Sequence, residues 1–223
     1  RIRSDEVAVG EALHQRAGAE AVGAVVGEIR LADGYFVAPY TLANYIASTK
    51  LEKVGTDHAA FAEAENAVQQ RIDKVLGVQG GRTVMDLHRE LGGIMWEYVG
   101  MARTREGLET AVGKIRALRE QFWNEVKVPG RADNLNKNLE LALRVADYME
   151  FAEMMALDAL QRTESCGCHF REESQTPDGE ALRDDEKFSY VAAWEYKGEG
   201  QAPEMHKEEL NFEFVTPSQR SYK

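Results

Sequence analysis

The amino-acid sequence predicts a mainly α-helical protein that ends in a β-hairpin. Two observations lead to this prediction. Between residues 83 and 163, apolar residues recur at spacings of three and four, which places them on one face of a helix. After residue 187, apolar and polar residues alternate instead, and that period of two is typical of a strand with one buried face.

The first part of the chain combines a small-residue segment with two expected helices. Residues 1–36 are rich in Gly, Ala and Val, a composition that suits turns, short buried strands or a closely packed helix. Helices are expected at Thr41–Ser48 and at Asp57–Leu76. Gly77 and the Gln-Gly-Gly run at 79–81 should end the second helix, because glycine tolerates the left-handed conformation that follows a helix.

Three longer helices are expected next, at Thr83–Gly100, Thr104–Val126 and Asp133–Thr163. Each has one apolar face, so the simplest arrangement is a spectrin-repeat-like three-helix bundle that buries these faces together without a cofactor. The expected stripes are Leu87, Leu91, Ile94, Met95 and Tyr98; Leu108, Ala111, Ile115, Leu118 and Phe122; and Leu139, Leu143, Ala146, Phe151, Met154, Leu157 and Leu160.

The expected hairpin follows a polar, acidic loop with a strong turn signal, Thr-Pro-Asp-Gly at 176–179. Its first strand is expected to alternate through Phe188, Tyr190, Ala192, Trp194 and Tyr196. Its second strand is expected where Leu210, Phe212 and Phe214 alternate with polar residues. The run Arg-Asp-Asp-Glu-Lys at 183–187 is expected to be a solvated loop.

Composition excludes several classes of function. The chain has 38 acidic and 27 basic residues and a formal charge of -11, which argues against nucleic acid as a partner. No apolar run approaches the roughly 20 residues that cross a bilayer, so another subunit would have to hold the protein at a membrane. The beginning of the chain does not resemble a signal peptide, and a processed or truncated chain is expected.

Cys166, Cys168 and His169 form the most reactive-looking cluster in the sequence. A structural zinc ion needs four ligands at workable spacing, and Cys-x-Cys-His offers a crowded set, so packing at a turn is the favoured reading. A disulfide across one intervening residue would be strained, and a reducing compartment is expected. His169 and Arg171 are not expected to transfer protons. We therefore predict no metal site and no catalytic residue in this chain.

Several motifs then point to a family. They are Leu-His-Arg-Glu-Leu-Gly-Gly-Ile-Met-Trp-Glu-Tyr-Val-Gly-Met-Ala-Arg at 87–103, Ala-Asp-Tyr-Met-Glu at 146–150 and Glu-Ser-Cys-Gly-Cys-His-Phe-Arg-Glu-Glu at 164–173. Val-Ala-Ala-Trp-Glu-Tyr at 191–196 and Arg-Ser-Tyr-Lys at 220–223 agree with them. In order and in content, these motifs resemble the carboxyl-terminal part of succinate dehydrogenase and fumarate reductase flavoprotein subunits.

The resemblance implies that the FAD-binding and capping domains of such a subunit lie outside this chain. Residues 1–50 then resemble a remnant of the flavin-domain edge, followed by a helical bundle at 51–163 and a loop and hairpin at 164–223. His169 and Arg171 would join the turn at 164–173 to the flavin domain. Glu11 is similar to a glutamate that contacts FAD in the family. The family's substrate-binding arginine aligns with Ala21, which cannot bind a carboxylate, so the chain alone lacks the expected catalytic residues.

What the resemblance implies about function is a role within an enzyme that interconverts succinate and fumarate. The partners would be the flavin-domain portion of the same subunit, an iron–sulfur subunit and, indirectly, a membrane-anchor cytochrome b subunit. The location would be cytoplasmic, peripheral on the cytoplasmic face of the inner membrane. Two alternatives remain: a stand-alone, non-catalytic binding or assembly module, and a related flavoprotein such as L-aspartate oxidase, which the tail motifs fit less well.

Overall fold

The computed structural model describes residues 34, 37–50, 53–198, 200–212, 214 and 216–219. Glu11 and Ala21 lie outside these described residues. Contacts between residues divide the chain into two units, which meet in sequence between Ala62 and Glu63.

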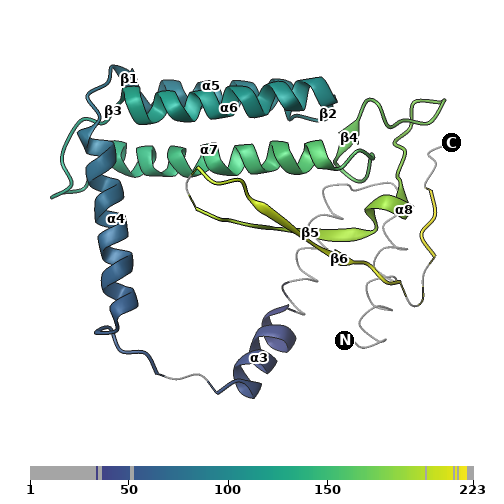
Figure 1. Ribbon diagram of the computed structural model, residues 1–223, viewed down its shortest axis with the longest axis horizontal. Coiled ribbons are helices and arrows are strands. Elements are labelled where there is room, and N and C mark those ends of the chain that lie inside the picture. Colours follow the sequence, from purple (N-terminus) through teal and green to yellow (C-terminus); the bar gives the residue numbers. More distant parts are fainter. Residues whose placement is uncertain are drawn as a thin grey trace. The chain divides into compact units, whose positions relative to one another are not determined.

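In the first unit, a single π-helical turn, η1 (Val37–Leu42), leads directly into the short helix α3 (Ala43–Ser48) (Figure 1). The backbone N–H of Thr49 donates to the Tyr45 carbonyl at 2.9 Å, and the Ser48 hydroxyl donates to the same oxygen at 3.2 Å. The helix predicted at Thr41–Ser48 is therefore confirmed, with its first residues in the wider π-helical form.

Helix α4 (Ala59–Gly77) continues into the second unit and ends at the glycine that the sequence marks as its stop. The apolar side chains of α4 are buried only near that end. Val75 is fully buried, whereas Val68 is 57% exposed. Arg71 of α4 forms an ion pair with Asp147, which fixes this end of α4 against the bundle.

The bundle consists of α5 (Val84–Tyr98), α6 (Arg105–Glu125) and α7 (Lys137–Gln161), and α6 packs along both of its neighbours. Each helix begins at a side chain that accepts a hydrogen bond from a free backbone N–H of the first turn. Thr83 accepts from Asp86, Thr104 from Gly107, and Asn136 from Asn138 and Leu139. The third helix therefore begins four residues later than predicted, because Asn136 caps it.

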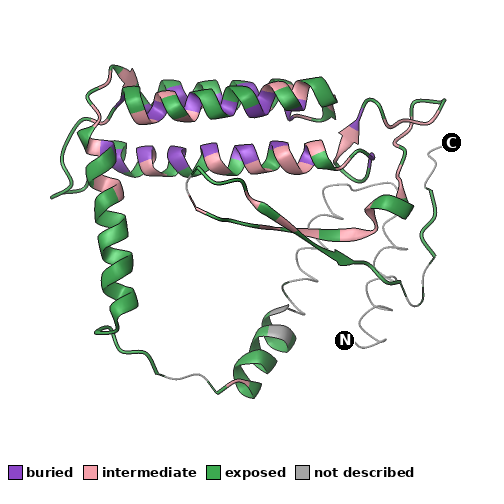
Figure 2. Cartoon of the chain, viewed as in Figure 1, coloured by how far each residue is buried: buried purple, intermediate pink, exposed green. Residues whose placement is uncertain are grey.

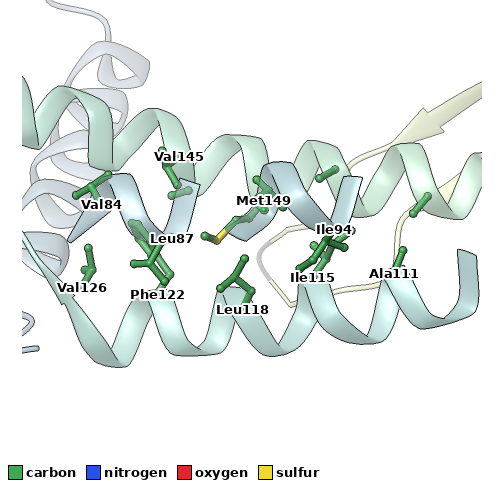
Figure 3. Close-up of a cluster of buried hydrophobic side chains, with 14 of the residues drawn as sticks. Val84, Leu87, Ile94, Ala111, Ile115, Leu118, Phe122, Val126, Val145 and Met149 are labelled. Carbon is green, nitrogen blue, oxygen red and sulfur yellow. The ribbon is translucent and has the colours of Figure 1, made fainter. Parts of the chain in front are cut away.

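The core lies where the three helices face one another (Figures 2 and 3). The predicted stripe of α6 is confirmed, since all five of its residues are buried, among them Ile115 and Phe122. On α5, Leu87, Leu91 and Ile94 are buried as predicted, whereas Met95 and Tyr98 are only partly buried. The stripe predicted for α7 is partly wrong: Phe151 is 65% exposed and three of the leucines are only partly buried. Small side chains occupy much of the inner face of α7 and let the backbones approach closely. The buried apolar residues of α7 are Leu139, Ala142, Val145, Ala146, Met149, Ala152, Ala156 and Ala159.

Two very short parallel strand pairs fasten the ends of the helices. β1 (Arg82–Thr83), just before α5, pairs with β3 (Val126–Lys127), just after α6. β2 (Ala102–Arg103), between α5 and α6, pairs with β4 (Phe170–Arg171), which follows α7. Near the first pair, a Cβ atom on Gly80 would overlap the backbone of Glu125, so glycine is required for this close approach.

After the short helix α8 (Asp185–Phe188), strand β5 (Tyr190–Glu195) pairs with β6 (Glu204–Glu209) in an antiparallel hairpin. The helix α8 begins within the run that was expected to be a loop and includes Phe188, which was expected in the first strand. The second strand was also predicted wrongly, because β6 ends before Leu210. Five of the six residues of β6 are exposed, so this strand carries no alternating apolar pattern. The hairpin is held to α7 through Trp194, whose Nε1 donates to Asp158 at 2.8 Å.

None of the helices in the described part of the chain is both long and apolar enough to span a membrane.

Candidate functional site

The family-like stretch Glu164–Glu173 forms a turn directly after α7, here called the Glu164–Glu173 turn. Its tip is a two-residue turn in which Cys166 N donates to His169 O at 2.9 Å and His169 N donates to Cys166 O at 3.0 Å. Gly167 occupies the first central position with φ of +59°, a conformation that side-chain-bearing residues rarely adopt. The glycine of the motif is thus explained by the geometry of the turn.

Arg171 closes the carboxyl-terminal end of α7. Its side chain is almost completely buried, and Nη1 donates to the carbonyls of Ala159 at 3.0 Å and of Leu160 and Arg162 at 3.4 Å. These carbonyls have no partner within the helix, and a positive charge there also interacts favourably with the helix dipole. The Ser165 hydroxyl holds the arginine in place by accepting from Arg171 N at 2.8 Å and donating to Arg171 O at 3.1 Å.

Glu173 joins the same arginine to the beginning of α6. One carboxylate oxygen accepts from Arg171 Nε at 3.1 Å, and the other accepts from the backbone N–H of Arg105 at 2.6 Å. Burial alone would raise the pKa of Glu173. The hydrogen bonds from Arg105 and Arg171 outweigh it and hold the pKa below its ordinary value.

His169 and Arg103 connect the turn to the end of α5. Arg103 Nε donates to the carbonyls of Val99 at 3.2 Å and Gly100 at 2.9 Å, and its Nη1 lies 2.7 Å from His169 Nδ1. His169 Nε2 lies 2.7 Å from the Arg162 carbonyl. Burial lowers the pKa of His169, and the nearby arginines lower it further.

Glu164 is a buried carboxylate that sequence reasoning did not single out. It is 3% exposed, accepts from Arg162 Nη1 at 2.6 Å, and accepts from the backbone N–H of Asp184 at 2.9 Å. The guanidinium of Arg162 also lies over the rings of Phe188 and Tyr190. Glu164 and Arg162 therefore attach the hairpin segment to the end of α7.

Both cysteine thiols are free and exposed. Although Cys166 is exposed as a residue, partial burial of its thiol and the Glu164 carboxylate raise its pKa, which disfavours the thiolate form that a nucleophile or metal ligand requires. Both ring nitrogens of His169 are already occupied, so the ring cannot join the thiols as a ligand without breaking these bonds. The turn brings together the residues that the sequence highlighted, in an arrangement that connects helix ends.

A second cluster of potential metal ligands lies on the hairpin, where Glu195, Glu204 and His206 have side-chain ligand atoms within 4.8 Å of one another. Glu195 and Glu204 are directly opposite in the strand register. The ammonium group of Lys197 lies 3.0 Å from the first carboxylate and 2.9 Å from the second. Lys197 thus neutralises two like charges that would otherwise repel each other across the hairpin.

A cleft of about 1030 Å³ lies between α4, α6, α7 and the turn of the hairpin in the second unit. In this cleft Glu153 of α7 is held by two arginines of α6, with Arg116 Nε and Arg119 Nη1 each 2.6 Å from one of its oxygens. The sequence gives no signal for this cluster, because the pairing arises only when the two helices pack together.

A family model described as "Fumarate reductase flavoprotein C-term" matches residues 88–222, which is more than half of the chain. The fumarate reductase flavoprotein subunit of Serratia sp. is 27% identical over 172 residues, covering 77% of this chain and 28% of that protein. The Escherichia coli fumarate reductase flavoprotein subunit is 30% identical over 148 residues, covering 66% of this chain and 24% of that protein. The chain thus spans less than a third of the length of these relatives.

Solved structures show the same fold. A quinol-fumarate reductase with menaquinol molecules matches with a TM-score of 0.62 and 23% identity, covering 85% of this chain and 30% of that one. The Sdh1 complex of Mycobacterium smegmatis matches with a TM-score of 0.59 and 23% identity, covering 76% of this chain and 27% of that one. Together with the family match, these likenesses show that the chain belongs to the family of fumarate reductase flavoprotein carboxyl-terminal regions, the last part of succinate dehydrogenase and fumarate reductase flavoprotein subunits.

Proposed function

We propose that this chain is the supporting helical domain of a flavoprotein subunit that interconverts succinate and fumarate. In this proposal FAD is bound mostly by residues outside the chain. Electrons pass from FAD to an iron–sulfur subunit and then to a cytochrome b membrane anchor, which holds the assembly on the cytoplasmic face of the inner membrane. Glu11 remains a proposed FAD contact. The domain boundaries at residues 50 and 163 also remain proposals.

The observation that carries this role is the Glu164–Glu173 turn. Three of its side chains are engaged at the ends of α5, α6 and α7: Arg171 and Glu173 join α7 to α6, and His169 joins α7 to Arg103. Groups that are fully engaged in holding helix ends favour a rigid support over acid–base chemistry. The geometry therefore supports a structural contribution to the subunit.

Large apolar side chains near the end of α5 offer a surface for such a role. Trp96 is 87% exposed and Met101 is 88% exposed. Exposed aromatic residues and methionine are enriched where proteins meet one another, and each of these side chains gains from leaving water. We propose that this end of α5 contacts the flavin-binding portion of the subunit or its iron–sulfur partner.

The test is co-purification of the tagged chain with separately produced flavin-binding portion and iron–sulfur subunit of a family member. We expect a yellow complex with the flavin-binding portion. The double variant Trp96→Ala/Met101→Ser should weaken the association at least tenfold and leave the unfolding midpoint unchanged. Leu135→Ser is the matched control, because Leu135 is 90% exposed but lies in the loop before α7. Failure of the unaltered chain to associate with either protein would contradict the proposal.

The alternative is a stand-alone assembly module that has kept the helical fold. The observation that favours it is that the buried side chains of α5, α6 and α7 form one apolar cluster, and that no buried side-chain nitrogen or oxygen of the described residues lacks a hydrogen-bond partner. Flavin absorbance separates the two proposals. The assembly module would be supported if the chain formed a colourless complex with another protein and did not associate with a flavin-binding portion.

A further inference from the structure

The ring of His169 has a proton arrangement that its neighbours dictate. A guanidinium group can only donate hydrogen bonds, so Arg103 Nη1 must donate to His169 Nδ1, at 2.7 Å. The Nδ1 atom therefore carries no proton. The proton of the neutral ring is on Nε2, which donates to the Arg162 carbonyl at 2.7 Å. Both bonds exist together only when the imidazole is uncharged.

These two bonds connect parts of the chain that are far apart in sequence. Arg103 Nε also donates to the carbonyls of Val99 and Gly100, the two residues that follow α5. Arg162 directly follows α7 as its C-cap, and its carbonyl also accepts a hydrogen bond from Arg171 Nη1 at 3.4 Å. One neutral imidazole therefore links the end of α5 to the end of α7.

The charges that face the ring oppose its protonation. Arg103 comes from β2, Arg162 from the end of α7, and Arg171 from β4. Asp158 and Cys166 line a small cavity of about 370 Å³ together with the ring, Arg103 and Arg162, and Asp158 accepts a hydrogen bond from Trp194. Glu164 is already paired with Arg162. Three guanidinium groups thus outnumber the carboxylates that could stabilise an imidazolium.

We propose that His169 is an acid-released latch, which holds the ends of α5 and α7 together while it is neutral and lets them separate when it is protonated. A proton on Nδ1 would point a donor at the donor group of Arg103, so this hydrogen bond must break. The ring would then place a fourth positive charge among three arginines. The Glu164–Glu173 turn would consequently loosen from the α5 end, next to the small cavity.

The direction of the pH effect follows from the same contacts. Burial and the arginines hold the pKa of His169 below its ordinary value of 6.5. The unfolded chain therefore takes up a proton at this histidine before the folded chain does, and stability falls as pH falls below about 6.5. The contribution of the latch is fully present above that pH.

The experiment compares urea unfolding of the full chain and of His169→Gln between pH 7.5 and 5.0, with His88→Gln as a histidine control. We expect the folding equilibrium constant of the unaltered chain to fall relative to that of His169→Gln, by up to tenfold for each pH unit below about 6.5. The His88→Gln variant should keep the full pH dependence. If His169→Gln changed the unfolding free energy by the same amount at every pH, His169 would contribute only by packing, and the latch proposal would be overturned.

A nitrogen-15 NMR titration of the unaltered chain provides a test that does not depend on a variant folding. It should show a neutral, Nε2-protonated ring for His169 at pH 7, with amide exchange in residues 164–173 accelerating as that ring becomes protonated. A ring already protonated at pH 7, or a turn whose amide exchange does not follow the titration, would also overturn the proposal.

Discussion

Glu173 bridges two helix ends by accepting hydrogen bonds from Arg171, which caps α7, and from the backbone N–H of the first residue of α6. A helix beginning attracts negative charge and a helix end attracts positive charge. The pair Arg171 and Glu173 satisfies both at once, with the two charged groups 3.1 Å apart. The motif that links this chain to its family is therefore, at these two positions, a device for joining helices.

Replacing Arg171 by methionine should cost about 3 kcal/mol of unfolding free energy, because it leaves the α7 carbonyls and one oxygen of Glu173 without their partner. Chemical denaturation by urea, followed by far-ultraviolet circular dichroism, measures this loss. Arg131→Met is the matched control: its side chain is 81% exposed and pairs only with exposed Asp133, so it should change stability by less than about 0.5 kcal/mol. Equal effects of the two substitutions would contradict the capping role.

Replacing Glu173 by glutamine should cost about 1 kcal/mol at pH 7, as expected for a charge removed from a helix beginning. The pKa of Glu173 lies below its ordinary value of 4.5 in the folded chain. The stabilising effect of the carboxylate is therefore present above about pH 4.5 and lost as pH falls further. The stability difference between the chain and Glu173→Gln should accordingly shrink towards zero near pH 3, and a constant difference from pH 7 to pH 3 would count against the charge interaction.

A methyl group at Gly80 should destabilise the chain by about 2 kcal/mol, because its Cβ would overlap the backbone of Glu125 and force the strand pair β1–β3 apart. The control is Gly92→Ala, in the middle of α5, where a Cβ would meet nothing within 4 Å. Alanine there should raise stability by about 0.5–1 kcal/mol, since it favours helix more than glycine does. Thermal unfolding of both variants checks the pair. If Gly80→Ala did not lower the unfolding temperature, or lowered it no more than Gly92→Ala did, the proposed close contact at Gly80 would be contradicted.

The cysteines should be dispensable for folding. Both thiols are exposed, so Cys166→Ser and Cys168→Ser should each shift the unfolding free energy by less than about 0.5 kcal/mol. Two thiols should react with a thiol reagent in the native chain, and a strong metal chelator should leave the unfolding midpoint where it is. A fall in the midpoint with chelator would reveal a metal site that the favoured reading leaves out.

Much of the bundle could be predicted from the sequence because the buried face of a helix shows as apolar residues spaced three and four apart. Leu87, Ile115 and Phe122 lie on the stripes that their spacing predicts. The inner face of α7 could not be predicted in the same way, because five of its buried residues are alanines, and alanine marks a buried face less clearly than a large apolar residue does. Some large apolar residues of α7 lie elsewhere: Phe151 is exposed.

The hairpin shows a different limit. Strand β6 pairs with β5 through its backbone while most of its side chains remain in water, so its sequence carries no alternation. The more strand-like residues Leu210 and Phe212 come just after it. Arg171 and His169 were predicted to join the turn to the flavin domain, and that contact stays a prediction, because their hydrogen bonds among the described residues are made within this chain. They contact helix ends of this chain, and contacts between residues so distant in sequence leave no local pattern.

The most direct test of the joined helix ends is amide hydrogen exchange at Arg105, the first residue of α6. An N–H at this position has no partner within its own helix and would ordinarily exchange quickly. Because it donates to Glu173 at 2.6 Å, we expect slow exchange in the unaltered chain and fast exchange in Glu173→Gln, with the middle of α6 unchanged. Fast exchange of the Arg105 amide in the unaltered chain would contradict the account.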